Sequence, residues 1–197
     1  MSMSFFYGFE LETAPGLVMT PRPATEALVD AAVALVAGRP ARVADIGTGS
    51  GAIAIALASR LPQAEIWASD VSPAAVDLAR LNAARHGFAD RIHMAEGDLL
   101  DPIPGQLCVI VANLPYLPDE LKDHPTYAEY RVEPREAIFA PDNGMALYRR
   151  LLESAEERLD VEGALVIQFR RSILQAERQA LPLLRERLER AAVAAAA

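Results

Sequence analysis

The sequence predicts a Rossmann-like three-layer α/β sandwich, in which helices cover both faces of a mostly parallel sheet. Short apolar runs alternate along the chain with helical patterns, and this alternation is typical of βαβ units with helices of roughly ten to fifteen residues. Two of the runs, VIVA and ALVI, are apolar throughout, as expected of strands that are buried on both faces. A glycine-rich stretch, DIGTGSGA, closes the first run and is typical of the first turn of such a fold.

The first elements follow an aromatic and turn-rich lead, residues 1–20. Prolines at the start and a glycine near the end predict a helix over 21–38. Apolar runs predict strands over 41–47 and 64–70, and GAIAIALASRL predicts a helix over 51–61. A further helix is expected over 72–87, with Ser72 as N-cap, Pro73 at its first position and Gly87 after its end.

The remaining elements continue the same alternation. RIHMAEGD and LCVIVAN predict strands over 91–98 and 107–113, and GALVIQF predicts a fifth strand over 163–169, preceded by a helical pattern over 142–160. After the fifth strand only a helix-like pattern remains. We therefore expect a single domain that consists of a lead and helix (1–40), a core (41–170) and a helical tail (171–197).

Composition and charge disfavour several kinds of partner, location and binding site. The formal net charge of −8 disfavours a nucleic-acid partner, because such a surface repels a phosphate backbone. No apolar run approaches the ~20 residues of a membrane span and no secretory signal opens the chain, so a cytoplasmic protein is expected. The single cysteine, Cys108, predicts a buried, inert thiol. His86, His93 and His124 lack metal-ligand spacing, and we expect no metal site.

Candidate ligand-binding residues stand where the strands end, because ligands of such sheets bind at the carboxyl ends of the strands. Asp45 precedes a loop in which Gly47, Gly49 and Gly51 allow positive φ and close approach of a ligand. The same letters satisfy G-x-G-x-x-A, so a dinucleotide remains an alternative ligand. Asp70 ends the second strand, where a carboxylate can accept both ribose hydroxyls, with helix capping as the alternative.

Two further strands end in polar residues. Asp98 follows the third strand and can accept a hydrogen bond from an adenine amino group, with a turn aspartate as the alternative. The fourth strand ends in Asn113, followed by Leu114, Pro115 and Tyr116. An amide oxygen, a proline-fixed turn and an aromatic face at this point predict the place where cofactor and substrate meet.

These motifs resemble a known family. ADIGTGSGAIAIALA (44–58) is similar to motif I of class I S-adenosyl-L-methionine-dependent methyltransferases, and NLPY (113–116) resembles the signature of amino-methyltransferases. PRPATEALV (21–29) and YRVEPREAIFAPDNGMALYRRLL (130–152) resemble segments of the release-factor glutamine N5-methyltransferases (PrmC/HemK). The four motifs occur in the order of the family and span most of the chain.

The resemblance implies a cofactor, a reaction and a set of site residues. The cofactor is S-adenosyl-L-methionine, and the reaction is methylation of a glutamine side chain in a release-factor-like protein. Asn113 and the backbone carbonyl of Leu114 hold the two hydrogens of the acceptor amide, Pro115 fixes the turn and Tyr116 supplies a flat face. The cofactor-binding residues it implies are Asp45, Gly47, Thr48, Gly49, Ser50, Gly51, Asp70, Asp98, Leu99 and Asn113.

Some features depart from the family. The PRPATE motif begins at Pro21, so we expect no N-terminal helical domain and allow for a small partner protein instead. Leu114 replaces the usual proline, and Leu99 stands where an aromatic residue is common. An adenine-N6 methyltransferase acting on nucleic acid and a catalytically idle cofactor-binding module therefore remain alternatives.

The end of the sheet also departs from the pattern of class I enzymes, which finish with an antiparallel hairpin. That hairpin is not recognisable after GALVIQF. The fifth strand is then an exposed edge, which invites pairing with another chain. We therefore expect either a homodimer that covers this edge or a truncated, marginally stable protein.

Overall fold

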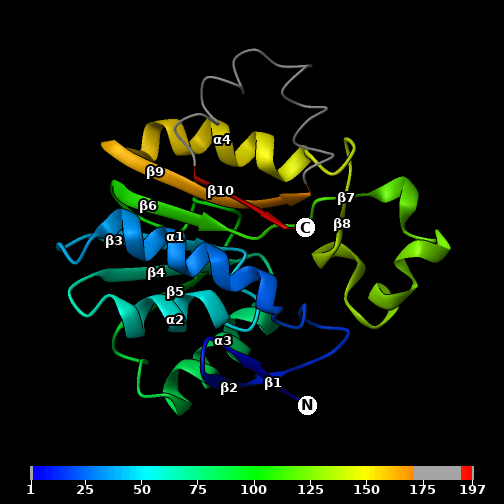
Figure 1. Cartoon of the computed structure of the whole chain (residues 1–197), viewed down its shortest axis with the longest axis horizontal. Helices are drawn as coiled ribbons and strands as arrows, with labels where there is room; N and C mark the ends of the chain where they lie inside the picture. The colour runs from blue at the N-terminus through cyan, green and yellow to red at the C-terminus, as the bar shows by residue number, and fades with distance from the viewer. Residues whose placement is uncertain (1, 171–191, 197) are drawn as a thin grey trace.

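The computed structural model describes residues 2–170 and 192–196. Its centre is a six-stranded sheet in which all neighbouring strands are parallel (Figure 1). In spatial order the strands are β10 (Ala192–Ala196), β9 (Leu159–Arg170), β6 (Leu107–Ala112), β3 (Arg42–Ile46), β4 (Glu65–Asp70) and β5 (Ile92–Glu96). The predicted parallel α/β sheet is confirmed.

Helices cover both faces of this sheet. Val109 and Val111 of β6 belong to the core that contains residues of α1 (Glu26–Val36), α2 (Ala52–Arg60) and α3 (Pro73–Arg85). Side chains of a strand alternate between faces, so Ile110 and Ala112 pack on the opposite side, with residues of α4 (Ala146–Arg158). The all-apolar run of β6 is therefore explained by burial on both faces.

Local signals set the ends of the helices as the sequence predicted. The Ser72 hydroxyl accepts the N–H of Ala75 at 3.3 Å, and Pro73 occupies the first position of α3. Gly51, with a φ of 82°, is the N-cap residue of α2. A side chain is strained at this φ, which is why a glycine stands where the loop after β3 turns into the helix.

The lead folds into a β-hairpin, which the sequence did not predict. β1 (Ser2–Phe6) and β2 (Phe9–Thr13) pair antiparallel around Tyr7 and Gly8. Both turn residues have positive φ, 51° and 85°, as in the primed turns that match the twist of a hairpin. Asn82 of α3 anchors the hairpin, because its amide accepts the N–H of Glu12 at 2.8 Å and donates to the carbonyl of Glu12 at 2.9 Å.

The chain's end corrects two expectations. Ala192–Ala196 form a strand where a helical tail was predicted, and they pair parallel with Val166–Arg170 of β9. β9 is therefore not the edge of the sheet, so the expectation of an exposed edge at β9, from which either a homodimer or a truncated protein was inferred, was wrong. The rest of the predicted tail helix, 171–191, falls outside the described residues. No antiparallel strand joins the sheet within the described ranges.

The segment after β6 leaves the sheet and forms a small lobe beyond the carboxyl ends of the strands (Figure 1). Its frame is a short parallel pair, β7 (Leu117–Pro118) and β8 (Phe139–Ala140). The lobe also contains the 3-10 helices η2 (Asp119–Leu121), η3 (Pro125–Val132) and η4 (Arg135–Ala137), while η1 (Pro23–Thr25) precedes α1. Residues of this lobe, among them Pro134 and Ala137, line a cleft at that end of the sheet.

Candidate active site

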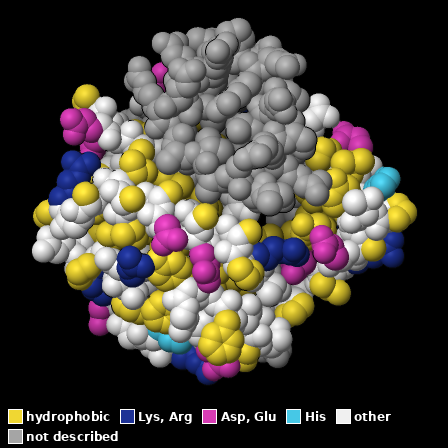
Figure 2. Space-filling model, viewed as in Figure 1, with side chains coloured by type: hydrophobic (Ala, Val, Ile, Leu, Met, Phe, Trp, Pro, Cys, Tyr) yellow, Lys and Arg dark blue, Asp and Glu magenta, His cyan; other side chains and the backbone are white. Residues whose placement is uncertain are grey.

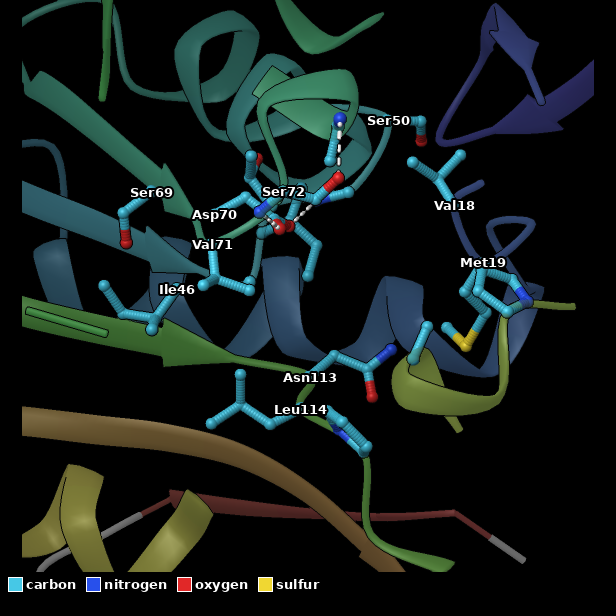
Figure 3. Close-up of a pocket in the computed structure, with 18 of the residues that line it drawn as sticks. Val18, Met19, Ile46, Ser50, Ser69, Asp70, Val71, Ser72, Asn113 and Leu114 are labelled. Atoms are coloured by element: carbon cyan, nitrogen blue, oxygen red, sulfur yellow. Dashed lines mark hydrogen bonds between the residues drawn. The ribbon is translucent and has the colours of Figure 1, made fainter. Parts of the chain in front are cut away.

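A cleft opens at the carboxyl ends of β3, β4 and β6, where the strand order of the sheet reverses. Ligands of open α/β sheets bind at this switch point. The cleft is open to solvent, and together with its mouth it encloses about 1160 Å³ of space. Figure 3 shows Asp70 and Asn113 on opposite sides of it, with Val18 and Met19 of the lead at a third side.

Most of the predicted site residues meet in this cleft. Asp45 and Gly51 do not line it, and Tyr116 lines a smaller pocket beside it. The predicted residues that line the cleft are Gly47, Thr48, Gly49, Ser50, Asp70, Asp98, Leu99, Asn113, Leu114 and Pro115.

The buried side chain of Asp45 supports the glycine loop through hydrogen bonds. Its side chain is fully buried, and its Oδ2 accepts the hydroxyl of Thr48 at 2.7 Å and the N–H of Ala54 at 3.1 Å. The other oxygen, Oδ1, has no hydrogen-bond partner among the described residues. Burial raises the pKa of Asp45 to about 7, although the two hydrogen bonds oppose that shift. Asp45 thus holds the loop and the start of α2 together.

Gly47 brings the glycine loop against the segment after β6. Its φ is 73°, and a Cβ on this residue would lie 2.7 Å from Cδ2 of Leu114. The backbone conformation therefore favours glycine, and any larger residue would also push the Leu114 side chain aside. As a result, the loop expected to hold the cofactor and the segment expected to hold the acceptor are in direct contact.

The carboxylate of Asp70 faces the cleft from the end of β4. Oδ2 accepts the N–H of Gly49 and Oδ1 accepts the N–H of Ser72, each at 2.9 Å (Figure 3). Ser72 itself caps α3, so Asp70 is not needed for that role. A carboxylate offers about four lone-pair sites, and two remain for a ligand.

The turn after β5 contributes Asp98 and Leu99. Asp98 forms a hydrogen-bonded ion pair with Arg150 of α4, and the pair raises the pKa of Arg150. Leu99 has a φ of 46°, an unusual conformation for a leucine that is often found at functional sites. The hydroxyl of Ser69 holds it there by donating to the Leu99 carbonyl at 2.7 Å.

Asn113 is oriented by the segment before α1. Its Nδ2 donates to the hydroxyl of Thr25 at 3.3 Å, and Thr25 is almost completely buried. The hydrogen bonds among the described residues engage only the nitrogen of this amide, which leaves Oδ1 as an acceptor for a ligand. Thr25 lies in the PRPATEALV motif, but no role was predicted for it from the sequence.

Tyr148 of α4 fixes the backbone of Leu114, which the sequence did not reveal. The fully buried hydroxyl accepts the N–H of Leu114 at 2.9 Å. It also lies 3.0 Å from the carbonyls of Leu114 and Gln168, and its single proton can be donated to one of them at a time. Burial raises the pKa of Tyr148, so the hydroxyl stays protonated.

Gly144 and Glu133 make close contacts that hold the lobe in place. Gly144, with a φ of 84°, lies so close to the Tyr116 carbonyl that a Cβ would collide with it. Glu133 is buried and accepts the N–H of Thr20 at 3.0 Å. Through this bond the lobe is tied to the lead, where Met19 lines the cleft.

On the face shown in Figure 2, the described Lys and Arg side chains lie scattered among acidic and apolar ones. Among the described residues, no group of three or more His, Cys, Asp or Glu could hold a metal ion. Within the same residues, no helix has the length and apolar character needed to cross a membrane.

Residues 22–129 match the methyltransferase small domain family. The chain is 39% identical over 179 residues to the release factor glutamine methyltransferase of Escherichia coli, covering 90% of this chain and 64% of that protein. It is 40% identical over 167 residues to the enzyme of the same name from Moorella thermoacetica, covering 83% and 58% respectively. The chain thus spans less than two thirds of the length of these relatives.

A solved structure shares the fold. The hMettl16 catalytic domain in complex with MAT2A 3'UTR hairpin 1 superposes with a TM-score of 0.63 at 17% identity, covering 78% of this chain and 59% of that one. At this identity the likeness extends to the fold alone.

Proposed function

The chain belongs to the methyltransferase small domain family, and we propose that it transfers a methyl group from S-adenosyl-L-methionine to the side-chain amide nitrogen of a glutamine in a release-factor-like protein. The observation that carries the proposal is the NLPY segment at the head of the cleft. Asn113, Leu114 and Pro115 of this segment line the cleft together with the glycine loop, which Leu114 approaches closely at Gly47. A cytoplasmic location is part of the same proposal.

The residues of the cleft fit this cofactor. The carboxylate of Asp70 has lone pairs left for ribose hydroxyls, and the loop from Gly47 to Ser50 presents backbone to the cleft. Pairing with Arg150 leaves Asp98 further acceptor capacity for an adenine amino group. When bound, the cofactor supplies a methyl group on a positively charged sulfur. The acidic residues on this side of the cleft favour such a cation.

The acceptor side explains how an amide can react. The lone pair of an amide nitrogen is delocalised, so the nitrogen is a poor nucleophile, and orientation contributes most to the rate. We assign one hydrogen of the acceptor NH₂ to Oδ1 of Asn113 and the other to the carbonyl of Leu114. Thr25 and Tyr148 hold these two acceptors in place. A carbonyl has two lone pairs, so the Tyr148 contact leaves one for the substrate.

Relatives support a protein acceptor. The proteins named release factor glutamine methyltransferase are 39% and 40% identical to this chain over most of its length. The net charge of −8 disfavours a nucleic-acid acceptor.

Transfer of a labelled methyl group is the direct test. The purified chain is incubated with labelled S-adenosyl-L-methionine and a release factor, and in parallel with RNA and DNA. We expect label in the release factor, and no label in a release factor whose acceptor glutamine is replaced by alanine. Label in nucleic acid alone would overturn the proposal, and cofactor binding without transfer to any acceptor would identify an idle binding module.

Asn113→Ala separates chemistry from cofactor binding. The substitution removes an acceptor that orients the reacting nitrogen, so we expect turnover to fall by about 10²-fold or more. Cofactor affinity, measured by calorimetric titration, is expected to stay near that of the wild type. Single-turnover transfer at an undiminished rate would show that Asn113 has only a structural role.

A further inference from the structure

A small pocket adjoins the cleft and shares Thr25, Asn113 and Leu114 with it. Two further residues in its lining carry buried polar atoms without a hydrogen-bond partner among the described residues. These atoms are Nε of Arg22 and Oε1 of Gln168. Gln168 is only 5% exposed.

Contacts hold the guanidinium of Arg22 and the backbone of Gln168. The guanidinium of Arg22 lies over the ring of Tyr130, 4.5 Å from its centre, which restricts the direction of the Nε–H. The backbone carbonyl of Gln168 lies 3.0 Å from the Tyr148 hydroxyl, which also binds Leu114. The unpaired donor and the unpaired acceptor thus belong to side chains that line the same pocket as the NLPY segment.

Unpaired buried polar atoms are costly for a folded protein, and they call for an explanation where they occur. One donor and one acceptor in the same pocket match a neutral group that presents one acceptor and one N–H. An amide is such a group. A carboxylate would be repelled by Oε1 of Gln168, and an ammonium group would be repelled by Arg22.

The source of that amide follows from the assignment of the reacting group. Both hydrogens of the acceptor NH₂ are already assigned to Asn113 and Leu114, so the N–H for Gln168 has to come from another amide. In a polypeptide, the nearest such groups are the peptide bonds that flank the acceptor glutamine.

We propose that the small pocket is a main-chain subsite for the acceptor polypeptide. Arg22 Nε–H donates to a backbone carbonyl, and Gln168 Oε1 accepts a backbone N–H next to the glutamine that is methylated. This inference rests on the proposed function and adds a reason why the substrate is a polypeptide. Arg22 and Gln168 are then specificity-determining residues that bind the substrate without contacting the reacting nitrogen.

Gln168→Met tests the acceptor half of the pair, because methionine has a similar shape and no amide. We expect kcat/KM for a glutamine-containing release factor to fall about tenfold, the size of one hydrogen bond, with unchanged cofactor affinity. The melting temperature is expected to stay equal or to rise, because an unpaired buried oxygen is removed. A structural role for Gln168 would instead lower the melting temperature. Gln106→Met, on the surface, is the matched control.

A modified substrate tests the backbone contact itself. Peptide acceptors are compared in which each peptide bond flanking the glutamine is in turn replaced by an ester, which removes its N–H. We expect one ester peptide to react about tenfold more slowly with the wild type and no slower than the parent peptide with Gln168→Met. Equal penalties for both enzymes would show that Gln168 does not bind this N–H.

Arg22→Met tests the donor half. Arg60→Met is its matched control, because Arg60 also lies over a tyrosine ring, that of Tyr7, on the surface. We expect a loss of about tenfold in kcat/KM for Arg22→Met and none for the control. If the wild type methylates the protein but the variants and ester peptides react equally well, only the subsite is refuted. If the wild type methylates no protein, the proposed function and this inference fail together.

Discussion

The carboxylate of Asp70 accepts two backbone N–H groups, one from the glycine loop and one from the start of α3. It therefore organises the cleft before any ligand arrives, and it also has lone pairs for ribose hydroxyls. Because Asp70 both positions the glycine loop and offers acceptors to the ribose, its loss is expected to lower cofactor affinity more than the loss of a residue that only contacts the ligand.

Asp70→Ala is expected to weaken S-adenosyl-L-methionine binding by about ten- to a hundredfold, the size of a charge-assisted hydrogen bond of roughly 1.5–3 kcal/mol. Calorimetric titration measures the change. Asp77→Ala is the control, because Asp77 is an exposed carboxylate on α3 that pairs with Arg80. Unchanged affinity in Asp70→Ala would refute the ribose assignment.

Asp45 predicts a dependence of stability on pH. Its pKa rises from 3.8 to about 7 on folding because the carboxyl group is buried. The folded protein therefore binds this proton more tightly than the unfolded chain. The resulting stabilisation is complete below a pH of about 3.8 and is lost as the pH rises through about 7.

Asp45→Asn isolates this effect, because an amide oxygen can still accept from Thr48 and Ala54 without ionising. We expect the melting temperature of the variant, relative to that of the wild type, to rise between about pH 5 and about pH 8. The rise is expected to be several degrees, since about 1 kcal/mol shifts the melting temperature of such a domain by roughly 2–4 °C. A difference that does not change with pH would mean that Asp45 stays ionised throughout this range.

At the scale of elements, α4 supports the site from the face of the sheet opposite α1. Its Tyr148 binds the backbone of Leu114 at the end of β6 and lies next to the carbonyl of Gln168 at the end of β9. The Tyr148 side chain thus links the ends of β6 and β9, although the whole lobe lies between these strands in the sequence.

Tyr148→Phe keeps the ring and removes the hydroxyl, which leaves a buried N–H of Leu114 without its partner. We expect a loss of roughly 1–3 kcal/mol in the free energy of unfolding and a lower turnover with nearly unchanged cofactor affinity. Chemical denaturation and single-turnover transfer measure the two effects. Tyr7→Phe removes an exposed hydroxyl bonded to Asp30 at 2.6 Å and is expected to change little.

The elements that the sequence predicted are those with strong local signals. Ser72, Pro73 and Gly87 mark the ends of α3, and the apolar runs around Val111 and Val166 mark buried strands. The hairpin β1–β2 was missed although the pair Tyr7–Gly8 is a turn signal, because its strands are short and their alternation is weak. β10 was missed because an alanine-rich run favours a helix, and only pairing with β9 makes it a strand.

At the site, the sequence predicted the residues that follow strands and missed those that reach the cleft from elsewhere. Asp70 and Asn113 could be predicted because parallel strands end at one edge of a sheet. Arg22, Tyr148 and Gln168 come from different parts of the chain, and only the folded structure brings them to the NLPY segment. Asp45 was expected to bind the cofactor; in the structure it is buried, does not line the cleft and accepts the hydroxyl of Thr48 in the glycine loop.

At the scale of the whole molecule, β9 and β5 are expected to differ in amide hydrogen exchange. β9 pairs with β6 on one side and β10 on the other, whereas β5 pairs only with β4 among the described residues. Successive amides of a strand point to opposite sides, so we expect uniform protection around Val166 and Ile167. In β5, every second amide is expected to exchange fast. Alternating protection in β9 as well would show that β10 does not cover it.

The parallel sheet also determines when the site can arise during folding. β3 pairs with β6, where Val43 is opposite Val109, and these residues meet only after the chain between them has closed a long loop. Such non-local pairings form slowly. Gly47 and Leu114, which follow these two strands, become neighbours only after that event. In a refolding experiment, the ability to bind cofactor is therefore expected to appear in the last kinetic phase, after the helices have formed.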